Sequence, residues 1–270
     1  MVTIALMLPM LALSCLLCDS VAYSDEPKAA RSIDLLGWKL TLPIDAEGKF
    51  SGNAAEIPPD RLAGGYAHAD LFQVGSDGTL TFWAPVIGAT TDNSDYPRSE
   101  LREMLDATDE SVNWRVGGSH VLTARCRVRQ VPSSQKVIIG QIHSFTGKAL
   151  PLVKLQFFKG RIEALVKRSP KRGGDLKLEL AKADLDSDIA YEIRLDDGKL
   201  SITVNGHTQR VNILEGDPAW AEQTFYFKAG AYCQDNDGPP TEGARVTFSC
   251  LRATHSCESK NKMKDMTSLK

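Results

Sequence analysis

The chain of 270 residues carries 32 basic and 34 acidic residues, and its formal net charge at pH 7 is −2. Hydrophobic residues make up 42% of the chain and charged residues 24%, which is typical of a folded globular protein and argues against disorder. The near-neutral balance gives no reason to expect a nucleic-acid partner, and a polyanionic ligand would need a local positive site.

The first segment of the chain is short and apolar. Residues 4–18 read IALMLPMLALSCLLC, a length that suits the hydrophobic region of a secretory signal peptide better than a membrane span. Ser20 and Ala22 are small residues at the two positions that a signal peptidase reads. We therefore predict a signal peptide over residues 1–22, an N-terminal extension over 23–31, and a secreted protein, extracellular or periplasmic, without membrane contact after cleavage. A membrane anchor is the alternative.

Four of the six cysteines would remain in the mature chain: Cys126, Cys233, Cys250 and Cys257. An even number in a secreted chain permits disulfides, and a Cys250–Cys257 pair would close a short loop. Sequence cannot choose among the pairings. No CxxC pair or His/Cys cluster has zinc spacing, so the sequence predicts no structural zinc site.

Short alternating segments separated by turn residues dominate the rest of the chain. The expected strands cover residues 38–42, 70–74, 79–84, 121–128, 137–143, 152–158, 161–167, 191–195, 200–204, 209–213, 224–232 and 244–251. Helical turns are expected near 58–62 and 218–223. This pattern predicts an all-β, single-domain β-sandwich of the jelly-roll type over residues 32–254, with two large antiparallel sheets and a polar tail over 255–270. A monomer is expected.

Two further segments place polar side chains on one face of a strand, where alternate residues point the same way. In RSELRE at 98–103, Arg98, Glu100 and Arg102 share a face. In GQIH at 140–143, Gln141 and His143 share a face. Each segment alone is explained by solvated or hydrogen-bonded polar groups.

The segment YFKAGAYCQ at 226–234 adds a third polar face, with Tyr226, Lys228, Gly230, Tyr232 and Gln234 pointing one way. Gly230 is interpreted as open space for an approaching ligand. Three such faces together are better explained by one site on a single concave surface than by three unrelated coincidences.

RSELRE, QIH and YFKAGAYCQ, in this order, resemble the three signature segments of the alginate lyases of polysaccharide lyase family 7, and WKLTLP at 38–43 resembles the family's first strand. The resemblance covers residues 36–251. It implies a jelly roll whose concave face binds alginate. By position, Arg98, Gln141, His143 and Tyr232 match the catalytic set, and Glu100, Arg102, Lys228 and Gln234 match residues that line the substrate groove.

The chemistry implied is β-elimination of 1,4-linked uronates, which leaves a 4,5-unsaturated sugar at the non-reducing end. Arg98, Gln141 and a protonated or donating His143 would neutralise the carboxylate next to the C5 proton. Tyr232 would protonate the leaving oxygen, with Tyr232 or His143 as the base. The scheme needs no cofactor or metal, and no carboxylate cluster suggests calcium. The resemblance also favours guluronate-containing stretches, through Ile142. An open groove favours endolytic action, with lids at 90–95 and 144–150.

Three other functions fit parts of the pattern. A glycoside hydrolase needs two carboxylates beside the bond, but Glu100 lies between arginines and Glu103 falls on the opposite face. A lectin-like binding protein would use the same fold without turnover. A lyase for another polyuronate, such as glucuronan, would share the chemistry.

Overall fold

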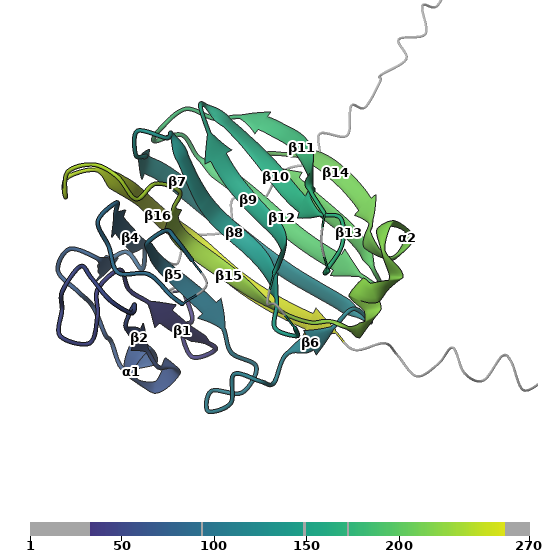
Figure 1. Cartoon of the computed structure of the whole chain (residues 1–270), viewed down its shortest axis with the longest axis horizontal. Helices are drawn as coiled ribbons and strands as arrows, with labels where there is room; N and C mark the ends of the chain where they lie inside the picture. The colour runs from purple at the N-terminus through teal and green to yellow at the C-terminus, as the bar shows by residue number, and fades with distance from the viewer. Residues whose placement is uncertain (1–32, 93, 148–149, 172, 257–270) are drawn as a thin grey trace, which may run out of the picture.

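Two antiparallel sheets face each other across the core (Figure 1), in a computed structural model that describes residues 33–92, 94–147, 150–171 and 173–256. The first sheet holds nine described strands. Eight of them lie side by side in the order β11-β10-β9-β8-β15-β5-β1-β2, and the ninth, β6, pairs with β15. In that order they span Asp175–Lys182, Arg161–Lys167, Pro151–Phe158, Lys136–Ser144, Thr224–Cys233, Arg98–Glu103, Trp38–Thr41 and Glu56–Ile57, with β6 at Trp114–Arg115.

The second sheet holds seven described strands in the order β14-β13-β12-β7-β16-β4-β3. They span His207–Asn212, Lys199–Val204, Ile189–Asp196, Ser119–Gln130, Gly243–Ser256, Leu80–Pro85 and Phe72–Val74. The helical elements are α1 (Pro59–Ala63), α2 (Ile213–Gly216) and the 3-10 helix η1 (Pro218–Glu222). Short turns join most neighbouring strands, as the alternating sequence pattern predicts.

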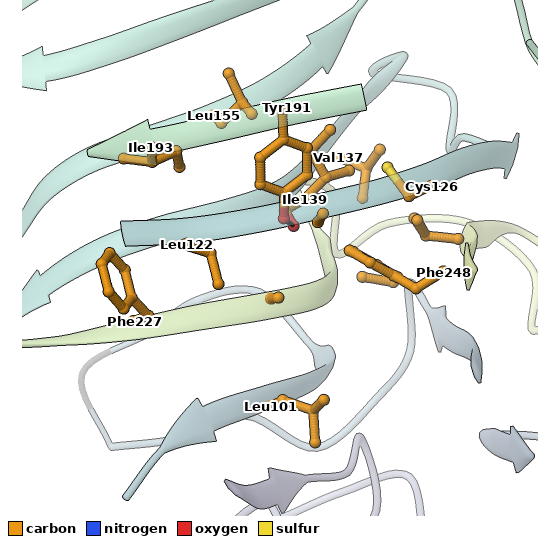
Figure 2. Packing of buried hydrophobic residues seen from close by; sticks show 14 of the residues in the cluster. Leu101, Leu122, Cys126, Val137, Ile139, Leu155, Tyr191, Ile193, Phe227 and Phe248 are labelled. Carbon is orange, nitrogen blue, oxygen red and sulfur yellow. Dashed lines mark hydrogen bonds between the residues drawn. The ribbon is translucent and has the colours of Figure 1, made fainter. Parts of the chain in front are cut away.

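The core lies between the sheets because alternate side chains of both sheets point inward. Figure 2 shows Phe227 and Leu101 from the nine-stranded sheet and Leu122, Ile193 and Phe248 from the other, all fully buried. Removing these apolar side chains from water is the dominant stabilising contribution. The inward faces thereby fix which residues of β5, β8 and β15 point outward.

The predicted all-β sandwich with two antiparallel sheets is confirmed, as are the helical turns at α1 and η1. The sequence analysis missed β11, an edge strand in which Leu176, Leu178 and Leu180 alternate with charged residues. It also missed α2, which starts where the Asn212 side chain accepts hydrogen bonds from the amides of Leu214 and Glu215. β16 continues to Ser256, beyond residue 251 where the predicted strand ends, and in this extension His255 pairs with His120 on β7.

The predicted signal peptide, the N-terminal extension, Cys257 and residues 257–270 of the tail lie outside the described residues. Within the described part, Cys126, Cys233 and Cys250 are unpaired, and the first two are buried in the core. No helix of the described chain is long and apolar enough to cross a membrane.

Candidate active site

The three polar segments become neighbours because β15 lies between β5 and β8. Lys228 stands opposite Arg102 on one side and Gln141 on the other, and Tyr226 stands opposite His143. Since paired residues of adjacent strands point to the same face, their side chains share the outer face of the nine-stranded sheet, away from the core. The structure therefore brings together segments that are far apart in the sequence, as predicted.

Gly230 allows the backbones of β15 and β5 to approach closely. A Cβ atom at this position would lie 2.5 Å from the carbonyl oxygen of Ser99 and 2.7 Å from the Cα of Glu100. Its φ of +154° is one that other residues rarely adopt, and the pairing with β8 shifts register between Ala229 and Tyr232. The interpretation of Gly230 as space for a ligand is therefore wrong, because the neighbouring strand fills that space.

Glu100 forms a buried hub beneath the outer face, with no exposed surface. Its carboxylate accepts hydrogen bonds from Gln141 Nε2 at 2.5 Å and Arg98 Nη1 at 3.2 Å, and forms an ion pair with Lys228 Nζ at 2.7 Å. Burial alone would raise the pKa of Glu100, but Lys228 and Arg98 outweigh it and hold the pKa below its ordinary value. Because this carboxylate is buried and already has three partners, the structure does not place Glu100 on the open surface of the groove that it was predicted to line.

The hub leaves an excess of positive charge around one carboxylate. Burial, followed by repulsion from Arg98, lowers the pKa of Lys228 to about 8, so this ammonium is charged below that pH. The Arg98 guanidinium stands 3.7 Å from the centroid of the Tyr232 ring, and its buried Nε has no hydrogen-bond partner in the described structure. These cations and the free donors of Arg98 suit an anionic ligand.

Arg102 belongs to the same face but is held by other groups. Its guanidinium lies 4.1 Å from the centroid of the Tyr226 ring and donates to the carbonyl oxygens of Glu103 at 3.0 Å and Glu110 at 2.7 Å. These contacts fix the head group while leaving its charge without a carboxylate partner among them. Arg102 therefore adds to the positive character of the face.

His143 is a neutral imidazole with one nitrogen available. Loss of surrounding water, followed by repulsion from Lys228, lowers the pKa of His143 to about 3. Its Nδ1 lies 2.9 Å from the carbonyl oxygen of Ser144, which can only accept, so Nδ1 carries the proton and Nε2 carries the lone pair. The predicted protonated form of His143 is therefore not the resting form. Tyr226 stacks on the ring, with its hydroxyl 3.2 Å from Nδ1.

Tyr232 presents a hydroxyl beside this cluster, and Gln234 stands apart. The Tyr232 hydroxyl lies 2.9 Å from Ser94 Oγ, in the loop before β5. Gln234 follows the end of β15, and its amide donates to the carbonyl oxygen of Cys233 rather than to any of the other described site residues. Two contacts were missed from the sequence. Tyr226 was predicted to lie on the polar face of its strand but was given no role. Ser94 lies in a loop, where the sequence has no periodic pattern to mark it.

Residues 33–255 match the family described as alginate lyase. The chain belongs to this family. A curated alginate lyase of Klebsiella pneumoniae is 29% identical over 286 residues, covering 86% of this chain and 92% of that protein. A solved structure of alginate lyase A1-II′ of family 7, in complex with substrate (GGMG), has a TM-score of 0.76 at 37% identity, covering 85% of this chain and 97% of the other.

An alginate lyase of Pseudomonas aeruginosa has a TM-score of 0.74 at 41% identity, covering 83% of this chain and 100% of the other. These similarities agree in fold, family and length of the matched region. The protein is a polysaccharide lyase of the alginate lyase family.

Proposed function

We propose that this alginate lyase cleaves its polymer internally, by β-elimination on the outer face of the nine-stranded sheet, with a preference for guluronate-containing stretches. The single observation that carries the mechanism is that one face of the sheet holds a neutral His143, whose Nε2 is available, the Tyr232 hydroxyl and the cations around Glu100. This arrangement supplies a base, an acid and a site for a carboxylate.

Arg98 and Gln141 hold the uronate carboxylate next to the C5 proton. Gln141 already donates one Nε2 hydrogen to Glu100, which fixes the amide with its nitrogen toward the hub and leaves the second hydrogen for the substrate. Negative charge develops on the carboxylate as the proton leaves C5, and fixed donors stabilise it in the transition state. Glu100 therefore acts through Gln141 and Arg98.

His143 and Tyr232 carry the proton transfers. A pKa of about 3 makes His143 a weak base in the free protein. An anionic substrate would raise that pKa toward the useful range, because it places negative charge next to the imidazole. Tyr232 gives a proton to the oxygen that leaves C4, and it also serves as the base for uronates whose C5 proton faces it.

The remaining functions fit less well. A glycoside hydrolase would need two carboxylates at the bond, but Glu100 is closed off and Glu103 points between the sheets. A lectin would not require a free imidazole nitrogen and a phenol on the same face. A glucuronan lyase would use the same residues, so the polymer itself must be tested.

Specificity for guluronate rests on an indirect effect. The Ile142 side chain is fully buried in the core, so it acts on the site through the position of β8 rather than by contact. The similar enzyme with bound substrate (GGMG) supports binding of an alginate oligosaccharide by this chain. Residues 4–18 support secretion after removal of residues 1–22, and N-terminal sequencing of the exported protein tests that cleavage.

The test is the ultraviolet absorbance of the unsaturated uronate, measured on polyguluronate, polymannuronate and glucuronan. We expect a rise on alginate polymers, fastest on polyguluronate, and a loss of about a hundredfold or more in Tyr232→Phe and His143→Ala. A rapid fall in viscosity at low conversion would support internal cleavage. Full activity in Tyr232→Phe would exclude the proposed acid, and activity confined to glucuronan would exclude the proposed substrate.

A further inference from the structure

The hydroxyl of Ser94 is surrounded by three hydrogen-bonding groups. Ser94 Oγ lies 3.0 Å from the carbonyl oxygen of Tyr96, 3.2 Å from the amide nitrogen of Tyr96 and 2.9 Å from the hydroxyl of Tyr232. A serine hydroxyl has one hydrogen to donate and two lone pairs to accept with. All three positions are therefore used.

The directions of two of these bonds are fixed by chemistry. The Tyr96 carbonyl can only accept, so it takes the single hydrogen of Ser94, and the Tyr96 amide can only donate. The remaining lone pair of Ser94 faces Tyr232, so the phenol donates its hydrogen to Ser94. In the resting protein the Tyr232 proton points at the loop, and the lone pairs of the phenol oxygen are left for the substrate side.

The loop that carries Ser94 is fastened to the end of β15. The amide of Cys233 donates to the carbonyl oxygen of Pro97 at 3.1 Å, and the Asn236 side chain donates to the carbonyl oxygen of Asp95 at 3.1 Å. The Ser94 amide also donates to the carbonyl oxygen of Thr91 at 2.9 Å. Ser94 is thus held next to Tyr232 by the backbone on both sides.

We propose that Ser94 is a positioning residue that holds Tyr232 in both of its protonation states, an inference that rests on the proposed role of Tyr232 in elimination. With a neutral Tyr232, Ser94 accepts the phenol hydrogen. With an ionised Tyr232, the Ser94 hydrogen turns from the Tyr96 carbonyl to the phenolate. Ser94 keeps its own proton throughout, and the proton that moves passes between Tyr232 and the substrate.

Few other groups compete for this role. Arg98 on β5 covers the Tyr232 ring and is itself paired with Glu100. The partner of Tyr232 on β8 is Ile138, which is uncharged, and the loop adds the exposed Asp95. Ser94 is therefore the hydroxyl that the described structure places on the phenol oxygen.

The experiment compares kcat and KM on alginate across pH for the wild type, Ser94→Ala and Ser94→Thr. We expect Ser94→Ala to lower kcat about tenfold with KM changed less than about twofold, because a hydrogen bond to a charged group is lost after binding. The limb of the kcat profile that depends on Tyr232 should move to higher pH, since the phenolate has lost a donor. Ser94→Thr keeps the hydroxyl and should restore both values.

Thr91→Ala in the same loop is the matched control, because its hydroxyl makes none of the described hydrogen bonds to the site, and it should behave as the wild type. An unchanged Ser94→Ala variant would overturn the proposal. So would a uniform loss at every pH that threonine does not restore, since that pattern describes a merely structural role. A wild type without turnover on any polyuronate would instead overturn the proposed function, so the two failures are distinguishable.

Discussion

Two buried glutamates three residues apart on β5 serve different parts of the molecule. Glu100 points to the outer face and is fully buried, whereas Glu103 points between the sheets with 4% of its surface exposed. The partners of Glu100 are the side-chain head groups of Lys228, Arg98 and Gln141. A carboxylate held by side chains with spare donors can organise a binding site.

The partners of Glu103 are fixed parts of the sandwich. Its carboxylate accepts hydrogen bonds from the Phe227 amide and the Trp114 indole, each at 3.0 Å, and contacts His255 Nε2 at 2.7 Å. His255 in turn contacts His120 through their Nδ1 atoms at 2.8 Å, which connects β5 and β15 to the opposite sheet. Glu103 therefore joins the two sheets behind the site, while Glu100 organises the surface in front.

The contacts of His120 fix the direction of its hydrogen bond with His255. His120 Nε2 lies 2.9 Å from the carbonyl oxygen of Gly117, so it carries a hydrogen, and burial lowers the pKa of His120 and keeps it neutral. Its Nδ1 must then accept from His255, whose Nε2 faces a carboxylate. His255 thus contacts His120 and Glu103 through opposite ring nitrogens.

The largest expected effect is on stability, in Glu103→Ala. Removing this carboxylate leaves the Trp114 indole, the Phe227 amide and His255 without their partner, which should lower the free energy of unfolding by about 3 kcal/mol. Urea unfolding monitored by tryptophan fluorescence measures this change. A loss below about 1 kcal/mol would show that the hydrogen bonds from Glu103 through His255 to His120 contribute little to joining the sheets.

A smaller effect, now on activity, is expected for Glu100→Gln. The neutral amide cannot hold Lys228, Arg98 and Gln141 together, so kcat should fall about thirtyfold to a hundredfold while the protein stays folded. Absorbance assays and thermal unfolding of the same samples separate the two effects.

Glu163→Gln is the matched control for that variant. Glu163 is also buried on the outer face and is also held by a glutamine and a lysine, Gln156 and Lys177, but neither His143 nor Tyr232 contacts it in the described structure. We expect its activity to stay within about twofold of the wild type. Equal losses of activity in both variants would break the comparison, because any buried carboxylate of the sheet would then matter equally.

The opposite roles of these glutamates could be predicted only in part from sequence. The two-residue period of RSELRE places Glu100 and Glu103 on opposite faces, and the structure agrees. Their partners come from strands that are distant in the sequence, and pairing decides which atoms meet. Gly230 was misread for the same reason, since the close approach of β5 is a property of the sheet.

The contact of Ser94 with Tyr232 was not predicted, because it depends on the path of a loop and the sequence of a loop has no periodic pattern. The elements that could be predicted are those in which local alternation and burial agree.

The smallest predicted effect is the pH dependence of substrate binding through Lys228. This ammonium has a lowered pKa of about 8, so it is charged below that pH and loses its charge as the pH rises through it. Glu100 has a lowered pKa and keeps its negative charge over the same range. The face therefore becomes less positive with rising pH, and KM for alginate should increase severalfold from pH 7 to 9. Lys228→Arg, whose charge does not titrate in this range, should flatten that increase, and an equally steep rise in this variant would assign the effect to another group.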